Sequence, residues 1–469
     1  MLSPRWLWLA AVGVLVGQPV APAVIVVESG CSLADAVAAA NSDSSVGGCP
    51  AGSGMDEIQL TEDVVLFAAL PPLTQAVIVD GNGFAVRRDG SAPDFAILEL
   101  GSSETTKLRN LTLSNGRAER GGGLNDTLLG DVTLSNLTIT GNEAFSKGGG
   151  IYKAGGDITL VASTISNNQA GTSGGGIYGS WDTSIALTAS TLSGNSAGTD
   201  GGGLTVGSMY GNLTLVNSTV TDNVAANSGG GVYATGYGAT VTVSNSTITG
   251  NSAAEAGGLS TFSGGYPIDV DVGNTIIANN TGGNCVNTSN ATDLGGNFDD
   301  DGSCLDSSPI SPGVDFETTA ANNGGATATH ALLPGSVAVN AAGACGLATD
   351  QRGFPRDDGV CDSGAYERVG FSLSITGDCP GAISVEVTTP SPNQSVALFV
   401  GPGTGSSTVP LGPCGGTELD IAMGRRWRSV ATNETGQALF AGTVPSSWCN
   451  RAVQAVDLGC ATSNTVLVP

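Results

Sequence analysis

The sequence has few cations, and they are unevenly placed. Lys and Arg total 16 against 41 Asp and Glu in 469 residues. No Lys or Arg lies between Lys153 and Arg352. The only histidine is His330. A net charge of −25 repels nucleic acid and anionic lipid, so we expect neither as a partner. Chemistry that needs a basic side chain has few groups available in the middle of the chain.

Long apolar runs are also scarce. Only the first residues contain one: Arg5 precedes an apolar run from Trp6 to Gly17, and Ala21-Pro22-Ala23 supplies small residues before a cleavage point. This pattern predicts a signal peptide over residues 1–23, with an N-terminal membrane anchor as the alternative. No later stretch reaches the ~18 apolar residues of a spanning helix. We expect no transmembrane segment in the mature chain, and a secreted, extracellular or cell-surface location.

The ten cysteines lie in neighbouring pairs along the chain. An even number in an exported protein predicts disulfides, although the sequence alone cannot fix their connectivity. Metal binding is the alternative, but the sequence has no CxxC or Cys/His cluster, so we expect no metal and no cofactor. Nearest-neighbour pairing predicts five bonds: Cys31 with Cys49, Cys285 with Cys304, Cys345 with Cys361, Cys379 with Cys414, and Cys449 with Cys460.

Glycine triplets recur through the middle of the chain. Triplets followed by an aliphatic residue begin at Gly121, Gly148, Gly174, Gly201 and Gly229, and an imperfect copy begins at Ala256, with steps of 26 to 28 residues. Between triplets, an alternating apolar pair such as Val132/Leu134 is followed by a third apolar position such as Ile139 or, in the last repeat, Ile276. Alternation with a period of two predicts short strands, three in each repeat.

Such a repeat buries its apolar side only when copies stack as successive coils of a solenoid. Glycine triplets then supply corners with positive φ. One asparagine per repeat follows the third apolar position, and we expect these residues to form a corner ladder of stacked amides, with a ligand-binding row as the alternative. The ladder comprises Asn142, Asn168, Asn195, Asn223, Asn251 and Asn279.

The predicted fold is therefore all-β: a right-handed parallel β-helix with a short N-terminal capping helix and a small C-terminal β-sandwich. Ser32 and Asp35 predict the start of the helix as a variant of the capping box. The predicted parts are a signal peptide (1–23), a cap with the first coils (24–120), repeats (121–285), C-terminal coils with a cap (286–370) and a sandwich module (371–469). In the module, residues 432–440 have the pattern of a hairpin.

Three motifs carry a family resemblance. CSLADAVAAAN, from Cys31 to Asn41, resembles the CSLREA-type module of exported bacterial β-helix proteins, with Ala34 and Asp35 in place of the usual Arg-Glu. The stretch from Asn322 to Glu367 resembles the C-terminal part of choice-of-anchor (Q-type) β-helix proteins, and the glycine repeats are similar to those of polymorphic outer-membrane proteins. The resemblance implies a pectin-lyase-like fold and a cell-surface or extracellular location, but no activity.

No set of residues forms a convincing catalytic pattern, and we assign no catalytic, metal-binding or cofactor-binding residue. Asp131 and Asp157 occupy the same place in consecutive repeats, where we expect a solvated surface pair. Asp299, Asp300 and Asp301 suggest calcium as an alternative to a structural turn. His330 is expected to be a hydrogen-bonded structural residue. The basic run from Arg425 to Arg428 is expected to be a charged strand edge, with anionic polysaccharide binding as the alternative.

Two classes of function remain open. The favoured one is a non-enzymatic secreted or surface protein that uses its sheet faces for adhesion or for contact with polysaccharide or cell-surface glycans. The alternative is a polysaccharide lyase or glycoside hydrolase with the pectin-lyase-like fold. Hydrolysis requires convergent carboxylates and uronate lysis requires a base beside a charge-neutralising cation. The repeats show neither pattern.

Overall fold

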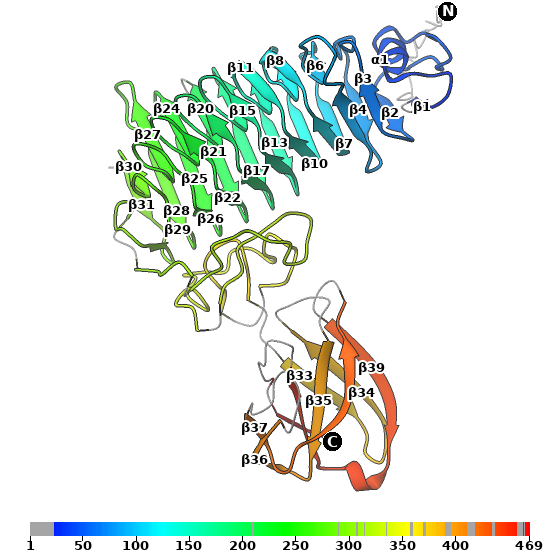
Figure 1. Cartoon of the computed structure of the whole chain (residues 1–469), viewed down its shortest axis with the longest axis vertical. Helices are drawn as coiled ribbons and strands as arrows, with labels where there is room; N and C mark the ends of the chain where they lie inside the picture. Colours follow the sequence, from blue (N-terminus) through cyan, green and yellow to red (C-terminus); the bar gives the residue numbers. More distant parts are fainter. Residues whose placement is uncertain are drawn as a thin grey trace, which may run out of the picture.

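The computed structural model shows a parallel β-solenoid of about eight turns, followed by small antiparallel sheets (Figure 1). It describes residues 23–208, 211–288, 290–305, 308–313, 315–333, 335–356, 360–368, 372–389, 395–409, 418–433, 437–456, 463 and 465–469. The predicted signal peptide therefore lies, apart from Ala23, outside the described residues. The predicted fold class is confirmed.

Each repeat makes one coil, and equivalent strands of successive coils pair in parallel. Two columns of strands form the largest sheet. We call them the first and second arms of the coil. The first arm contains β1 (Val24–Val27), β2 (Asp56–Leu60), β4 (Val77–Asp80), β7 (Thr106–Ser114), β10 (Val132–Thr140), β13 (Ile158–Val161), β17 (Ile185–Thr188), β21 (Leu213–Val216), β25 (Thr240–Ser244), β28 (Asp269–Gly273) and β31 (Ala291–Asp293).

The long strands β7 and β10 continue round the bend into the second arm. The other second-arm strands are β3 (Val64–Leu66), β5 (Ala85–Arg88), β14 (Thr164–Ser166), β18 (Thr191–Ser193), β22 (Thr219–Thr221), β26 (Thr247–Thr249), β29 (Ile276–Ala278) and β32 (Phe298–Asp299).

Two further sheets complete the coil. The eight-stranded sheet that follows the glycine triplets contains β6 (Leu98–Leu100), β9 (Leu124–Asp126), β12 (Ile151–Lys153), β16 (Ile177–Ser180), β20 (Leu204–Ser208), β24 (Val232–Gly236), β27 (Leu259–Ser263) and β30 (Cys285–Val286). The five-stranded sheet contains β8 (Arg117–Arg120), β11 (Glu143–Lys147), β15 (Gln169–Ala170), β19 (Ser196–Ala197) and β23 (Val224–Ala225). The sequence predicted three strands per repeat. The strands of this five-stranded sheet are a fourth strand of the coil, which the sequence did not predict.

Stacking of like residues fills the interior. The predicted alternating pairs lie in register on the first arm, where Val132 opposes Ile158 and Leu134 opposes Leu160. Ile139, Ile165 and Leu192 form the equivalent row on the second arm, and all of these side chains are buried. Because every coil contributes to the same apolar rows, one continuous core runs along the solenoid.

Buried asparagine side chains form the predicted ladder beside this core. Asn195 is typical: its Nδ2 donates to Asn223 Oδ1 (2.9 Å) and to Ile165 O (2.9 Å). Its Oδ1 accepts from both the backbone N and the Nδ2 of Asn168, each at 3.0 Å. The same pattern joins Asn142, Asn168, Asn195, Asn223 and Asn251.

The sixth member of the ladder is Asn280, not the predicted Asn279. Asn251 Nδ2 donates to Asn280 Oδ1 (3.0 Å), whereas Asn279 is exposed and has a φ of 61°. The register explains the error, because Ile277 rather than Ile276 opposes Ile248. The ladder residues also lack the left-handed backbone expected of them. The residue before each one has it: Gly141, Asn167, Gly194, Asp222, Gly250 and Asn279.

Glycine triplets serve the two purposes that their position requires. The first residue of each has the predicted positive φ, for example 70° at Gly174 and 65° at Gly201. The next two lie against the following coil, where a Cβ on Gly175 would come within 2.3 Å of Gly202 O. A side chain here would push neighbouring coils apart.

Helix α1 (Leu33–Ser42) caps the first coil as predicted. Ser32 Oγ accepts from Asp35 N (3.2 Å) and donates to Asp35 Oδ2 (2.7 Å). The buried face of the helix packs against β1 and β2, which protects the open edge of the solenoid. A disulfide joins Cys31 to Cys49 beside it.

After β32 the chain leaves the axis of the solenoid and returns along its side (Figure 1). The return segment, residues 326–367, lies on the second arms, where Thr191 Oγ1 donates to Ala328 O (2.7 Å) and Thr219 Oγ1 to Gln351 Oε1 (2.7 Å). The sequence predicted C-terminal coils with a cap over residues 286–370. In this stretch β31 and β32 pair in parallel with the preceding coil, and the return segment then covers coils that are already formed.

Buried ion pairs hold the return segment together. Arg352 lies 2.7 Å from Asp350, and Arg356 lies 2.8 Å from Glu367, with all four side chains almost fully inaccessible. Arg356 Nη2 also donates to Asn217 Oδ1 (3.1 Å) on the solenoid. This network and the disulfide from Cys345 to Cys361 give the return segment a structural role.

The C-terminal part contains small antiparallel sheets around its own core. One sheet contains β33 (Ser372–Gly377), β34 (Gly381–Thr388) and β39 (Gln437–Val444), and another contains β35 (Ser395–Gly401), β38 (Arg425–Ala431), β40 (Ala452–Val456) and β41 (Val466–Leu467). A third pairs β36 (Thr404–Thr408) with β37 (Glu418–Ile421), and η1 spans Ser446–Trp448. The expected hairpin over residues 432–440 is wrong, because β38 and β39 belong to different sheets.

Disulfide pairing follows the prediction in the solenoid but not in this C-terminal part. The pairs Cys31–Cys49, Cys285–Cys304 and Cys345–Cys361 form as expected. Cys379 instead bonds Cys449, 70 residues away, because the end of β39 leads the chain back beside the start of β34. Cys414 and Cys460 lie outside the described residues, so their oxidation stays a prediction.

The corrected register at the sixth coil makes a sharp prediction. Asn279→Gly should change the free energy of unfolding by no more than about 0.5 kcal/mol, because glycine accepts its positive φ and the side chain is exposed. Asn280→Gly should cost about 2–4 kcal/mol, since it leaves buried ladder groups without partners. Urea denaturation followed by circular dichroism measures both. Equal costs, or the reverse order, would refute the register.

Candidate functional site

The outward surface of the first arms is an uncharged strip. Outward residues alternate there with the buried aliphatic rows on β10, β13, β17, β21 and β25, and all are at least partly accessible. We call this strip the threonine face. It comprises Thr133, Ser135, Thr159, Val161, Ala186, Thr188, Thr214, Val216, Thr242 and Ser244.

Charges lie at the two ends of the threonine face. Lys107 and Arg109 precede Thr133 and Ser135 in the register, while Asp269 and Asp271 oppose Thr240 and Thr242. Across the five coils between them, hydroxyl and small aliphatic groups repeat at the ~4.8 Å spacing of neighbouring strands. A neutral strip of this length is unusual on a chain with a net charge of −25.

Exposed aromatic residues occupy turns that lead into the first arms. Trp181 precedes β17, Tyr237 precedes β25 and Tyr266 precedes β28, and their exposed fractions are 65%, 41% and 68%. Tyr237 and Tyr266 meet edge to face with their ring centroids 6.3 Å apart. The corresponding turn of the intervening coil, residues 209–210, lies outside the described residues. We call Trp181, Tyr237 and Tyr266 the aromatic rim.

A groove follows the bend between the first and second arms. It has a volume of about 360 Å³, and its lining includes Asn110, Asn136, Thr138 and Thr164, with Ala326 of the return segment also contributing. Further along the same bend, the return segment covers the groove. Asn217 Nδ2 donates to Thr349 O (2.6 Å), and Thr327 Oγ1 donates to Ala189 O (3.0 Å). Only the earlier part of this bend is therefore accessible.

A polar network anchors the floor of the groove. Asn136 Nδ2 donates to Asn110 Oδ1 (3.2 Å), and Asn110 Nδ2 donates to Asp80 Oδ1 (3.1 Å). Arg109 then lies 2.6 Å from Asp80 and 2.8 Å from Glu57. Burial by itself would raise the pKa of Asp80, but hydrogen bonds from Asn82, Asn110 and Arg109 outweigh it and lower that pKa. Arg109 thus pairs with both carboxylates, and the lowered pKa of Asp80 makes this group a poor proton acceptor.

A ladder of hydroxyl groups supports the same bend from inside and was not predicted. Ser163, Ser190 and Ser218 follow bend residues with positive φ, and each hydroxyl accepts a backbone N–H from the preceding coil. The sequence signal was available, because a serine stands three residues after the apolar pair in each of these repeats.

Asp131 and Asp157 lie in register on adjacent coils, as predicted. Both are exposed, and Asp131 Oδ1 accepts the backbone N–H of Asp157 at 3.0 Å. This contact is a backbone cap at the start of two strands. It gives no sign of a carboxylate pair converging on a substrate.

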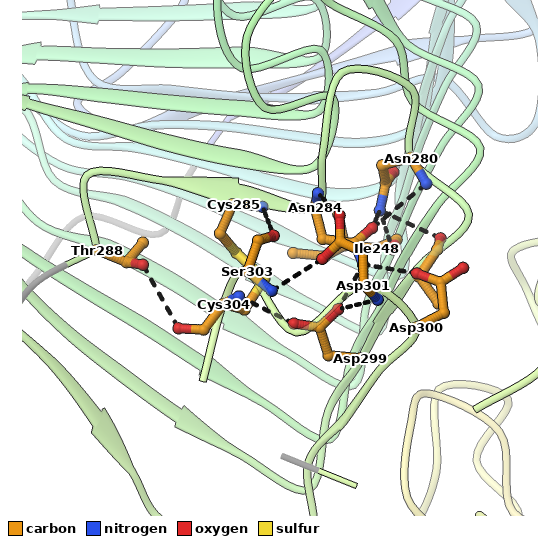
Figure 2. The surroundings of a disulfide bond; sticks show 11 residues. Ile248, Asn280, Asn284, Cys285, Thr288, Asp299, Asp300, Asp301, Ser303 and Cys304 are labelled. Atoms are coloured by element: carbon orange, nitrogen blue, oxygen red, sulfur yellow. Dashed lines mark hydrogen bonds between the residues drawn. A yellow bond between two sulfur atoms is a disulfide. The ribbon is translucent and has the colours of Figure 1, made fainter. Parts of the chain in front are cut away.

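The asparagine ladder ends at three consecutive aspartates, Asp299, Asp300 and Asp301 (Figure 2). Asn280 donates to Asn284 Oδ1 (2.9 Å), and Asn284 Nδ2 donates to Asp299 Oδ1 and to Asp300 Oδ1, both at 2.6 Å. Asp301 Oδ2 accepts the Asn284 backbone N–H at 2.9 Å. The disulfide from Cys285 to Cys304 closes the same loop.

These carboxylates are occupied by protein donors. Burial raises the pKa of Asp299, whereas hydrogen bonds from Ser303 and the Asn284 backbone outweigh burial and lower the pKa of Asp301. In the described part of the chain, no group of three or more His, Cys, Asp or Glu side chains is placed to hold a metal ion. The arrangement is a structural end to the ladder.

His330 pins the return segment to the solenoid. Its Nδ1 lies 2.7 Å from Glu317 O and its Nε2 lies 3.0 Å from Thr221 Oγ1. The ring is buried, and this burial lowers its pKa. It has the hydrogen bonds expected of a structural histidine.

The basic run lies on β38, an edge strand of its sheet. Arg425 and Arg426 are exposed, Arg428 stacks over Phe440 at 4.3 Å, and Trp427 packs against Trp448 at 4.9 Å. The alternation of arginine with a packed tryptophan fits the charged strand edge that the sequence predicted.

Neither a protein-family model nor a curated protein matches the chain. Among the described residues, no helix has the length and apolar character needed to cross a membrane. Four disulfides join cysteines in the described part of the chain, and they indicate an oxidising setting, which is typical outside the cytoplasm.

The lowered pKa of His330 predicts an acid-sensitive contribution to stability. The unfolded histidine titrates near 6.5, so below about pH 6.5 the unfolded chain binds a proton that the folded chain resists. Stability should therefore fall as the pH drops from this value towards the lower folded pKa. A His330→Gln variant should show a shallower loss of stability in thermal melts over this range. An unchanged slope would contradict the assignment.

Proposed function

We propose that this chain is an exported, non-enzymatic β-solenoid protein that contacts carbohydrate through its threonine face and aromatic rim. We further propose that it is related to the CSLREA-type and choice-of-anchor proteins that its motifs resemble. The observation that carries the functional proposal is the neutral, hydroxyl-lined strip, bordered by exposed aromatic rings, on a strongly acidic molecule.

The chemistry of this surface suits a neutral glycan. Threonine and serine hydroxyls both donate and accept hydrogen bonds, as sugar hydroxyls do. Tryptophan and tyrosine present large amphipathic rings, which can cover the apolar face of a sugar while their polar atoms stay in water. Trp181 and Tyr237 are two coils apart, so the rim and the strip extend along the solenoid axis by steps of ~4.8 Å. An extended polysaccharide chain fits such a surface better than a compact ligand does.

The aromatic rim can be tested directly. A glycan array with the mature protein would identify a neutral binding partner, and biolayer interferometry would then compare variants. Trp181→Ala and Tyr266→Ala should each weaken binding about two- to tenfold, because a lost aromatic contact costs roughly 0.5–1.5 kcal/mol. Phe67→Ala is the matched control, since Phe67 is as exposed as Trp181, at 65%, but lies outside the rim. Unchanged binding by the double rim variant would exclude this surface.

We also predict no lyase turnover on polygalacturonate or alginate, with or without calcium. None of the residues that make up the threonine face is a cation. At its end Arg109 is paired with Glu57 and Asp80, which leaves Lys107 as the other cation there. A general base contributes ~10²–10⁴-fold and must lie within reach of the substrate proton. The assay is ultraviolet absorbance of unsaturated product. Product that disappears in an Asp131→Asn variant would favour the enzymatic alternative.

A further inference from the structure

Lys153 is the largest side chain that is fully buried in the described solenoid. It lies on β12, and its partner Asp126 lies at the matching position of β9 in the preceding coil. The exposed fractions of the two side chains are 0% and 1%. Lysine and aspartate are almost never buried so completely unless they are paired.

The row of in-register residues that contains the pair has no other charged side chain. In the same row, Leu100 precedes Asp126 and Gly179 follows Lys153, and the later coils contribute Val206 and Ala234. Lys153 therefore has one acidic partner and no competing one along this row. The pair is held in register by the backbone ladder on both sides.

The contacts of the two groups are unequal. Lys153 Nζ donates to Leu128 O (3.0 Å) and to Gly155 O, while Asp126 Oδ1 accepts the Leu128 N–H at 2.9 Å. Asp126 Oδ2 lies 2.9 Å from Nζ, but this contact is not aligned as a hydrogen bond and Oδ2 has no other donor. One carboxyl oxygen is thus fixed by the backbone, and the other faces the amine without a hydrogen bond.

Burial also favours the uncharged form of Asp126. Desolvation is the largest influence on Asp126 and raises its pKa despite the nearby lysine. Removing two charges from water is costly, and a neutral amine beside a neutral acid avoids that cost. A neutral amine is a nucleophile, and lysine is used in this way when it is desolvated.

We propose that Lys153 and Asp126 condense to form an isopeptide bond that covalently joins two coils of the solenoid. A proton first passes from the Lys153 ammonium to Asp126 Oδ2. The Nζ lone pair then attacks Cγ, and Nζ gives a second proton to Oδ2. The bond from Cγ to Oδ2 breaks, and Oδ2 leaves with both protons as water. The product is a neutral amide, and no oxidant or other reactant is required.

The existing hydrogen bonds suit this product. The retained oxygen is Oδ1, which continues to accept the Leu128 N–H, and the leaving oxygen is the one that lacks a hydrogen bond. The single N–H of the new amide keeps one of the two carbonyl acceptors, Leu128 O or Gly155 O. The bond forms between positions that the fold has already brought together, and it replaces two ionisable groups with a neutral amide.

Intact mass measurement of the whole mature protein tests this proposal. After reduction and alkylation of the disulfides, the measured wild-type mass should be lower by one water molecule than the mass calculated for the alkylated mature sequence. Digestion should release a branched peptide that contains both residues, identified by tandem mass spectrometry. A branched peptide at this pair distinguishes the bond from dehydration elsewhere. A full sequence mass, with both residues in separate linear peptides, would show an ordinary buried ion pair and overturn the proposal.

Two variants serve as controls. Asp126→Asn should form the same amide by losing ammonia, so its final mass should equal that of the linked wild type. Lys153→Met removes the amine but keeps a long apolar side chain, and it should show no loss of mass beyond the substitution. Formation can also be followed in time after refolding of the purified chain. Loss of mass in the Lys153→Met variant would place the modification elsewhere.

Discussion

Hydrogen bonding between equivalent residues of successive coils is the constraint on which the rest of the structure depends. A coil gains its partners only when the next coil presents the same group at the same height, so the backbone ladders, the aliphatic rows and the buried asparagines impose one register. The amide ladder is the most demanding of these, because each buried side chain both donates and accepts. Glycine at the second and third triplet positions allows the coils to approach closely enough for this pattern.

That register also decides what the surface can present. Residues that alternate with the aliphatic rows must point outward, and repetition turns a single threonine into a strip. The acidic residues are therefore found mainly elsewhere, at the ends of the strip and in turns. The return segment adds a second constraint, since it covers the outward threonines of several later coils and leaves only the earlier part of the bend accessible.

The sequence predicted those features that repeat, and it failed where the repeat changes. Periodicity located the coils, the interior rows and five of the six ladder asparagines. It misplaced the last because one extra residue enters the sixth coil, which only the pairing of Ile277 with Ile248 reveals. The partner of Cys379, the folding back of the return segment and the pairing of Lys153 with Asp126 all depend on tertiary contacts. The aromatic rim went unnoticed because its members stand in turns that share no motif.

The return segment changes how the solenoid can come apart. In a simple stack of coils, each unit holds only its neighbours, so unwinding can begin at either end. Here the segment that ends the solenoid is tied across several earlier coils, through Thr191, Asn217 and Thr247, and is itself closed by a disulfide and buried ion pairs. The last coils cannot peel away one at a time without releasing this strap. We therefore expect unwinding of the cylinder to begin at the end near the helix.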